Sequence, residues 1–396
     1  MAIIFAGCSG PSAPSRANEI KVLETPAPPK SEASNITVSP NGTIYLSWMQ
    51  QTENDAPALR YAQLDPANGK WSAPVSVVEG ENLLANSADF PTMLATRSGR
   101  ILAQWLQING DGPFTYDSMV AQSDDGGKTW SPSRVLHDDG KQAEHGFVSL
   151  VESSTGEAEA IWLDGRNTVA PTPNPETQLG FTTIADDGVP GATQLVDTRI
   201  CDCCHTSAAL TAAGPVVVYR DRSPDEIRDI SIIRRVDGQW TQPAIVHADG
   251  WKIEGCPVNG PAVDAKGANV AVVWFTGAKD RERVNIAFSS DSGATFSAPV
   301  QVDDGNPMGH VDVAMTSYGA AIVTWMEREK GEGAAILLRE ITPDGKRSEP
   351  LVVAQTTSAR TASFPRMVAV GDDVVLTWTD IAEPSQVRVA RAHFGK

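Results

Sequence analysis

The most unusual chemical feature of the sequence is a cluster of sulfur and imidazole side chains. The segment Cys201-Asp202-Cys203-Cys204-His205 offers three thiols and a ring nitrogen within five residues, and Cys256 lies further along the chain. Thiolates and imidazoles are the ligands that soft and borderline metal ions prefer, so this set predicts a metal site for Cu or Zn. Met308 and His310 are candidate further ligands, and the thioether of Met308 would favour copper.

Arginines and acidic residues form a second group of candidates. Guanidinium groups bind carboxylates through paired hydrogen bonds, so arginines in neighbouring loops could hold an acidic ligand. The candidate ligand-binding arginines are Arg166, Arg220, Arg222 and Arg328. Ion pairing between neighbouring segments is the alternative role for them. Carboxyl and phenol groups can carry acid–base or nucleophilic catalysis. The candidates for such roles are Asp221, Glu226 and Tyr116.

Composition narrows the class of protein that must position these groups. The chain has 396 residues, of which 41% are hydrophobic, enough for a large core and too many for a disordered chain. Its 32 Lys and Arg against 49 Asp and Glu give a formal net charge of −17, which argues against nucleic acid or an anionic membrane surface as a partner. The 33 glycines and 27 prolines separate short Val-, Ile- and Ala-rich runs, a pattern that indicates many short strands.

One sequence unit occurs seven times along the chain. It consists of a short apolar segment, a glycine turn, and a second apolar segment that ends in an aromatic residue. These terminal aromatic residues are Trp48, Trp105, Trp162, Tyr219, Trp274, Trp325 and Trp378. They are 57, 57, 57, 55, 51 and 53 residues apart, a regularity that indicates a repeat architecture.

A second hairpin follows each unit and is clearest at residues 123–130 (SDDGGKTW) and 289–296 (SSDSGATF). Both segments resemble the Asp-box, or BNR repeat, of sialidase-like β-propellers, with the pattern S-x-D-x-G-x-T-[WF]. In such a turn the aspartate accepts backbone N–H bonds and the glycine adopts a left-handed φ. The resemblance implies an all-β fold in which each repeat is a four-stranded blade.

The two ends of the chain are predicted to meet. The seventh repeat stops before its fourth strand, and residues 19–24 (EIKVLE) resemble the missing strand. Pairing both chain ends in one blade closes the ring and removes an exposed sheet edge. We therefore predict that residues 19–396 form a single seven-bladed β-propeller closed by N-terminal strand pairing.

The propeller resemblance implies which loops share a face. Loops that lead into the inner strands, and loops between the second and third strands, lie together at one mouth of the central channel, where sialidase-like propellers bind ligands. The cysteine segment and most of the candidate arginines fall in these loops. Cys203, Cys256 and Met308 occupy equivalent positions at the starts of inner strands, so we expect all three near the channel mouth.

Disulfide bonding is the alternative to metal binding for the cysteines, because exported proteins normally oxidise them. Local bridges would be strained, since Cys201 and Cys203 are two residues apart and Cys203 and Cys204 are adjacent. A bridge from Cys256 to the cysteine segment is geometrically easy between neighbouring blades. Free buried thiols are the third option.

The resemblance also implies an enzyme as an alternative function. Sialidases hold the substrate carboxylate with three arginines, use a tyrosine activated by a glutamate as nucleophile, and use an aspartate as acid or base. Arg166, Arg222 and Arg328 could form such a clamp. Tyr116 is the tyrosine on a suitable loop. Because the Arg-Ile-Pro motif of that family is absent and no Tyr–Glu pair is evident, we predict no efficient cleavage of a generic sialoside.

The N-terminus indicates a cellular location. Residues 1–10 (MAIIFAGCSG) resemble the end of a bacterial lipoprotein signal, in which the cysteine, here Cys8, carries the lipid. We therefore expect residues 1–18 to be a truncated signal and tether, and the protein to be exported to the periplasm or the cell surface. Its membrane contact would then be the lipid anchor alone.

The leading functional prediction is an exported, lipid-anchored propeller that binds a small ligand or a soft metal at the channel mouth through the Cys/His cluster. An exo-acting glycoside hydrolase of the sialidase type on the same face is the alternative, with a glycan as its partner. A protein-docking platform without chemistry is the third option.

Overall fold

The computed structural model describes residues 19–54, 56–65, 68–169, 175–359 and 364–394. The predicted lipidation site Cys8 and the predicted signal and tether, residues 1–18, lie outside the described residues. Within the described ranges, no helix is long and apolar enough to cross a membrane. The helical segment found in these ranges is a single 3₁₀ turn, Ala278–Asp280.

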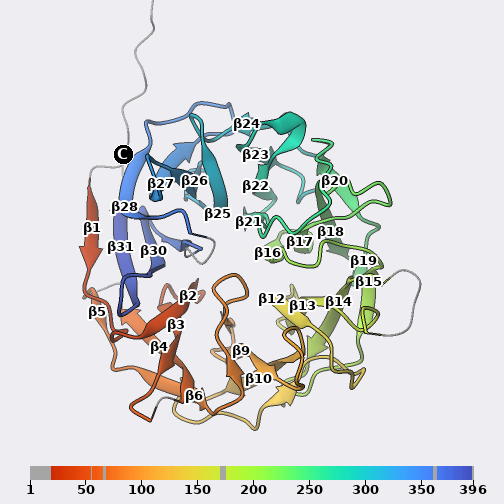
Figure 1. Cartoon of the computed structure of the whole chain (residues 1–396), viewed down its shortest axis with the longest axis vertical. Coiled ribbons are helices and arrows are strands. Elements are labelled where there is room, and N and C mark those ends of the chain that lie inside the picture. The colour runs from red at the N-terminus through yellow and green to blue at the C-terminus, as the bar shows by residue number, and fades with distance from the viewer. Residues whose placement is uncertain (1–18, 55, 66–67, 170–174, 360–363, 395–396) are drawn as a thin grey trace, which may run out of the picture.

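Seven antiparallel sheets form a ring, and each sheet is one blade of the predicted propeller (Figure 1). Blade 1 contains β2 (Ser31–Val38), β3 (Ile44–Gln51), β4 (Pro57–Asp65), β5 (Lys70–Trp71) and β6 (Val75–Glu79). Blade 2 contains β7 (Leu83–Leu84), β8 (Thr92–Ala95), β9 (Ile101–Ile108), β10 (Tyr116–Ser123) and β11 (Arg134–Val135). Blade 3 contains β12 (His145–Glu152), β13 (Ala158–Asp164), β14 (Gln178–Ile184) and β15 (Gln194–Asp197).

The remaining blades repeat the pattern. Blade 4 contains β16 (Ser207–Thr211), β17 (Gly214–Arg220), β18 (Ile230–Val236), β19 (Gln239–Trp240) and β20 (Ala244–His247). Blade 5 contains β21 (Ala262–Lys266), β22 (Asn269–Thr276), β23 (Arg283–Ser289) and β24 (Val300–Gln301). Blade 6 contains β25 (Pro307–Met315), β26 (Ala321–Arg328), β27 (Gly333–Ile341) and β28 (Leu351–Thr357). Blade 7 contains β29 (Arg366–Val370), β30 (Asp373–Asp380), β31 (Gln386–His393) and β1 (Ile20–Leu23).

The ring closes as the sequence predicts. The N-terminal strand β1 pairs antiparallel with β31, with Ile20 opposite Ala392 and Leu23 opposite Val389. Figure 1 shows this pairing as a red strand beside a blue one. Because β1 covers the outer edge of blade 7, that edge is not left open for pairing with another chain. The prediction of an all-β, seven-bladed propeller closed by N-terminal strand pairing is confirmed.

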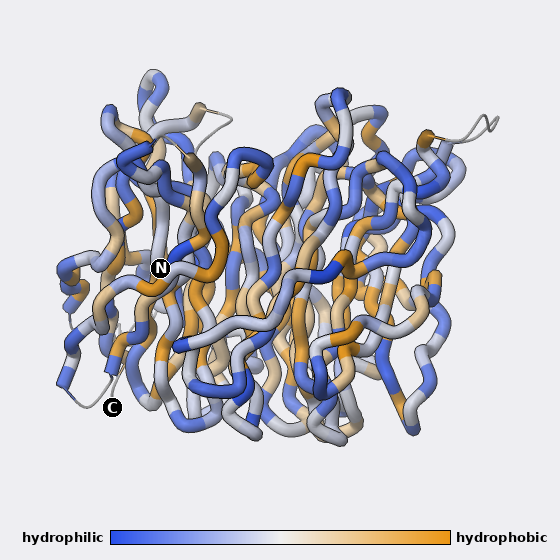
Figure 2. The backbone as a smooth tube through the Cα atoms, turned by 90° about the horizontal axis from the view of Figure 1, so that it is seen from below, coloured by the Kyte–Doolittle hydropathy of each residue, from blue (hydrophilic) through white to orange (hydrophobic). Residues whose placement is uncertain are grey.

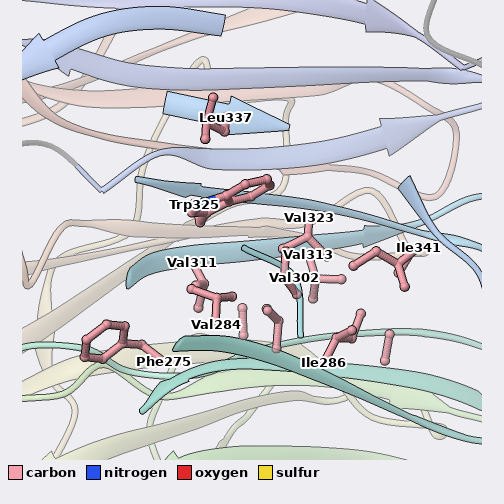
Figure 3. Packing of buried hydrophobic residues seen from close by; sticks show 14 of the residues in the cluster. Phe275, Val284, Ile286, Val302, Val311, Val313, Val323, Trp325, Leu337 and Ile341 are labelled. Atoms are coloured by element: carbon pink, nitrogen blue, oxygen red, sulfur yellow. The ribbon is translucent and has the colours of Figure 1, made fainter. Parts of the chain in front are cut away.

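The hydrophobic core lies between adjacent blades. The aromatic residue that ends each repeat falls in the strand that pairs with the inner strand of its blade, and all seven are at most 5% exposed. Between blades 5 and 6, Val284 and Ile286 pack against Val313 and Trp325 (Figure 3). Hydrophobic segments accordingly run through the middle of the molecule, and hydrophilic segments gather in the loops at its two faces (Figure 2).

The turns at residues 123–130 and 289–296 lie on the face opposite the loops that carry the candidate site residues. The Asp125 carboxylate accepts the Thr129 N–H at 2.9 Å and the Thr129 hydroxyl at 2.7 Å. These hydrogen bonds hold the pKa of Asp125 well below its usual range. Gly127 has a positive φ of 88°, and a side chain there would clash with the Tyr61 hydroxyl of blade 1. These turns therefore join neighbouring blades and do not offer a free carboxylate.

Candidate functional site

The inner strands begin at one end of the central channel, which we call the mouth face. It is formed by the loops that lead into the inner strands and by the loops between second and third strands. A cavity of about 150 Å³ lies in the channel and is lined by residues of the inner strands of blades 1 to 4 and by Arg366 of blade 7. Asp89, Phe90 and His205 are among its lining residues. Every candidate residue from the sequence, except Cys8, falls in the loops or strand ends of this face.

Aromatic rings pack together in the channel near the mouth face. The His310 ring stacks on Phe364 with a centroid distance of 3.9 Å, and the His205 ring lies 5.6 Å from Phe364 and 5.7 Å from Phe90. Burial lowers the pKa of His205 well below its usual value, so its imidazole is neutral. Both predicted imidazole ligands are therefore part of a ring cluster in the channel.

The cysteines form one disulfide and one close pair of thiols. Cys203 and Cys256 are bonded, with a Cα–Cα distance of 6.0 Å, and the bond joins the loops before β16 and β21. Cys201 and Cys204 are free and buried, with their Sγ atoms 3.2 Å apart. The hydrogen bond with Cys204, together with the charges of nearby arginines, lowers the pKa of the Cys201 thiol to about 6. The bridge from Cys256 was one of the alternatives left open by the sequence.

The predicted metal ligands are only partly brought together. The sulfur atoms of Cys201, Cys203 and Cys204 lie within 4.8 Å of one another. Among the described residues, two groups of potential ligand atoms this close contain cysteines, Cys201 with Cys203 and Cys204, and Asp202 with Cys203 and Cys256. Two further groups join His145 to carboxylates of blades 2 and 3, and neither His205 nor His310 belongs to any of the four. Met308 packs in the hydrophobic core of blades 6 and 7. The structure thus assembles a sulfur cluster, whereas the nitrogen and thioether ligands lie elsewhere.

The candidate arginines do not form a single clamp. The Arg166 Nε lies 2.7 Å from Asp164 in blade 3, and Arg328 of blade 6 pairs with Glu282. Arg220 is buried, and its guanidinium donates to the backbone carbonyls of Asn259, Arg228 and Phe275. These bonds join blade 4 to blade 5, so Arg220 has a structural role and does not face a ligand.

Three arginines instead surround one glutamate. The Glu226 carboxylate lies 2.8 Å from Arg222, 3.1 Å from Arg228 and 3.4 Å from Arg199. The hydrogen bonds from Arg222, with the neighbouring positive charges, lower the pKa of Glu226 to about 2. A carboxylate this acidic stays ionised at neutral pH and is a poor proton donor.

Asp221 is half-buried beside this cluster. Its carboxylate accepts the backbone N–H of Arg222 at 2.7 Å and the Ser231 hydroxyl at 2.9 Å. Burial raises the pKa of Asp221, and the nearby charge of Asp197 raises it further. Both of its oxygens are engaged inside blade 4, so the structure gives Asp221 no partner that would act with it on a substrate.

A tyrosine between two carboxyl groups lies at the junction of blades 2 and 3. Tyr116 begins β10, and its hydroxyl donates to Glu144 Oε1 at 2.6 Å. Asp89, in the loop before β8, accepts the backbone N–H of Phe147 at 2.7 Å. No Tyr–Glu pair is evident in the sequence, because Tyr116 and Glu144 belong to different blades; the structure brings the two together, so the predicted absence of such a pair is wrong.

Tyr116, Glu144 and Asp89 form a triad, and its two carboxyl groups have pKa values near neutrality. Burial raises the pKa of Asp89 to about 8, and the charge of Glu144 adds to the shift, while the hydrogen bond from Phe147 opposes it. Burial raises the pKa of Glu144 to about 7, with a further contribution from the charge of Asp202. Burial and both carboxylates raise the pKa of Tyr116 far above its usual range, so its phenol stays protonated. Glu144 is half-buried and is the most exposed member of the triad.

The backbone around Glu144 is held firmly against blade 2. The Tyr116 N–H donates to the Ala143 carbonyl at 3.1 Å, and the Ser118 hydroxyl donates to the His145 carbonyl at 2.5 Å. The His145 ring is buried, stacks on His137 with a centroid distance of 3.5 Å, and lies 3.1 Å from an Asp139 oxygen. This network fixes the position of the Glu144 carboxyl relative to Tyr116.

Sequence reasoning missed Asp89 and Glu144. The turn glycines of repeats two and three are 57 residues apart, and on this spacing Asp89 corresponds to Gly146. A side chain at Gly146 would clash with the Asp89 carboxylate. The signal in the sequence that pointed to the junction of blades 2 and 3 was therefore the pairing of Asp89 with a glycine, Gly146, at the equivalent position of the next repeat.

Comparison with known proteins shows the fold. No family model and no curated protein matches this chain. An ulvan lyase of polysaccharide lyase family PL25, solved with -[GlcA(1-4)Rha3S]- bound, is 12% identical, with 93% of this chain and 95% of that chain covered and a TM-score of 0.60. An α-L-arabinanase of Penicillium chrysogenum, solved with arabinobiose, is 12% identical, with 94% and 98% covered and a TM-score of 0.53. A Dyadobacter fermentans protein of unknown function is 13% identical, with 95% and 98% covered and a TM-score of 0.55. At these identities the shared property is the β-propeller fold.

Proposed function

We propose that this chain is a glycan-cleaving enzyme whose acid–base group is Glu144, with Tyr116 and Asp89 as positioning residues. The observation that carries the proposal is the 2.6 Å hydrogen bond between Tyr116 and Glu144 at the mouth face. The ulvan lyase and the arabinanase with similar folds were solved with carbohydrates bound, which supports a glycan as the substrate class.

The protonation states of the triad suit proton transfer at neutral pH. A carboxyl group with a pKa of about 7 is present in both forms, so Glu144 can give a proton to a leaving sugar oxygen or accept one from water or substrate. Asp89, with a pKa of about 8, keeps its proton at neutral pH and adds no second negative charge. The Tyr116 hydroxyl orients the Glu144 carboxyl through its hydrogen bond.

Arg366 gives the cavity a preference for negative charge. It shares the channel cavity with Asp89, and its guanidinium carbon lies 5.2 Å from the centroid of the Phe90 ring. Its Nη1 lies 3.4 Å from Asp312, and its buried Nε and Nη1 make no hydrogen bond within the described residues. We therefore propose an acidic glycan, with Arg366 contacting its anionic group.

The test is cleavage by the purified full chain of ulvan, arabinan and a fluorogenic sialoside. We expect cleavage of an acidic substrate, and Glu144→Gln should lower the rate by at least about 100-fold because general acid–base groups contribute about that much. Glu157→Gln is the matched control, since Glu157 is exposed in the turn between β12 and β13 on the opposite face. Absence of cleavage of all three substrates, or full activity of Glu144→Gln, would contradict the proposal.

We also propose export with a lipid anchor on Cys8, which would place the enzyme in the periplasm or at the cell surface. The Cys203–Cys256 disulfide supports an oxidising compartment. Mass spectrometry of the mature N-terminus of protein extracted from membranes tests the anchor. A mature chain that begins elsewhere, without lipid on Cys8, would contradict it.

A further inference from the structure

The four cysteines of the mouth face form two pairs that differ in exposure. Cys256 is exposed and Cys203 is half-buried, and these two carry the disulfide. Cys201 and Cys204 are buried thiols beneath them. An oxidised pair at the surface therefore lies directly against a reduced pair in the interior.

The two pairs are close enough to react with each other. Cys201 Sγ lies 3.8 Å from Cys203 Sγ and 3.2 Å from Cys204 Sγ, so one thiol contacts both the disulfide and the second thiol. Exchange proceeds by attack of a thiolate on a disulfide sulfur, which requires this kind of contact. Arg228 Nη1 lies 3.3 Å from Cys201 Sγ and provides the positive charge that stabilises a thiolate.

We propose that the four cysteines form a thiol–disulfide exchange site, in which the Cys203–Cys256 disulfide and a Cys201–Cys204 disulfide interconvert. This activity is independent of the glycan chemistry proposed for Glu144. Cys201 and Cys204 are separated by two residues, the Cys-x-x-Cys spacing at which a local disulfide forms readily.

The exchange balances within the four sulfur atoms. The Cys201 thiolate attacks Cys203 Sγ; the Cys201–Cys203 bond forms, the Cys203–Cys256 bond breaks, and Cys256 leaves as a thiolate. Cys204 then loses its proton and attacks Cys201 Sγ, so that the Cys201–Cys204 bond forms and Cys203 leaves with the proton. Cys201 and Cys204 are oxidised by two electrons, Cys203 and Cys256 are reduced by two, and no outside reagent is needed.

The exchange carries a reactive thiol from the interior to the surface. Before it, both thiols are buried and solvent reaches only a disulfide. After it, Cys256 is an exposed thiolate that can meet a thiol or disulfide from solution. The covalent link between the loops before β16 and β21 is then also released.

The test is native alkylation of the full chain, purified without reductant, with N-ethylmaleimide as the probe. After an acid quench, peptide mapping should show alkylated Cys256 and a Cys201–Cys204 disulfide, because alkylation of the exposed thiol draws the exchange forward. Cys201→Ser removes the attacking sulfur, so labelling of Cys256 should fall by at least about tenfold. Cys204→Ser keeps Cys201 and should give labelled Cys256 together with a Cys201–Cys203 disulfide.

The Cys204→Ser measurement decides the matter even if Cys201→Ser does not fold. If Cys256 stays unlabelled in both the native chain and Cys204→Ser, with the Cys203–Cys256 disulfide intact, that disulfide does not exchange and the proposal is overturned. The proposal is also overturned if all four cysteines of every purified molecule are already joined in two disulfides. Near one equivalent of Cu or Zn on four reduced cysteines would also overturn it and support the metal prediction from the sequence.

Discussion

Glu144 and Glu226 lie on the same face of the propeller, yet their surroundings give them opposite properties. Burial, with Asp202 nearby, raises the pKa of Glu144 to about 7, whereas hydrogen bonds from Arg222 and neighbouring charges lower that of Glu226 to about 2. A carboxyl group becomes available for acid–base chemistry when it is partly desolvated beside other acids. A carboxylate surrounded by arginines instead becomes a fixed structural charge.

The largest expected effect concerns activity. Glu144→Gln should lower the rate of glycan cleavage by at least about 100-fold, whereas Glu226→Gln should change it by less than about threefold. Parallel kinetics of the two variants on the substrate that the wild type cleaves measure the contrast directly. Equal losses of cleavage rate in both variants would contradict the assignment of Glu144 as the acid–base group and of Glu226 as a structural charge.

A second effect is the pH dependence of stability caused by Asp89. Its folded pKa of about 8 exceeds the unfolded value of 3.8, so the folded chain retains a proton that the unfolded chain releases between these values. The free energy of unfolding should therefore fall by about 3 kcal/mol between pH 5 and pH 7 from this group. Asp89→Asn should remove that component.

Urea denaturation at the two pH values measures the Asp89 effect. Asp111→Asn, in the exposed loop between β9 and β10, is the control and should keep the wild-type dependence. If Asp89→Asn shows the same pH slope as the wild type, Asp89 is not protonated in the folded state at neutral pH.

Glu226 should show the opposite dependence. Its pKa is lowered, so its stabilising contribution is present above its unfolded pKa and is lost as the pH falls through about 2. Glu226→Ala should reduce the free energy of unfolding by about 1–2 kcal/mol at pH 7, because three arginines lose their shared acid. The deficit should shrink at pH 3.5. Asp225→Ala, an exposed neighbour, should have little effect; a similar loss in it would argue against the cluster.

The smallest effect is expected for Tyr116→Phe. The Tyr116 hydroxyl lowers the pKa of Glu144, so its removal should raise that pKa and move the corresponding limb of the pH–rate profile upward by about half a unit to one unit. Tyr318→Phe, in the turn between β25 and β26 on the opposite face, is the control. An unshifted profile in Tyr116→Phe would show that the protonation of Glu144 does not control the rate of cleavage.

Much of the fold could be predicted because its signals are local. The aromatic spacing predicted seven blades, and the similarity of residues 19–24 to a fourth strand predicted the closing pair β1 and β31. Each blade is built from residues within about 50 positions of one another, so short-range patterns of apolar residues and turns carry the information.

For the candidate site, the sequence predicted the face on which it lies but not which of its side chains meet. The sequence placed Tyr116 and the cysteine segment at the mouth face, and the structure places them there. Which groups meet was not predictable, because Tyr116 meets Glu144 of the next blade and Cys203 meets Cys256 of the next blade. Such contacts depend on how two blades are rotated against each other, which no local pattern records.

The sequence by itself determined the number of blades, the closure of the ring and the face that carries the candidate site residues. Only the tertiary structure decided that Glu226 receives three arginines while Glu144 receives a tyrosine and a nearby acid. The physical reason is that strand and turn formation follow from residues close in the chain. The pKa of a carboxyl group follows instead from burial and charges that the fold brings from elsewhere.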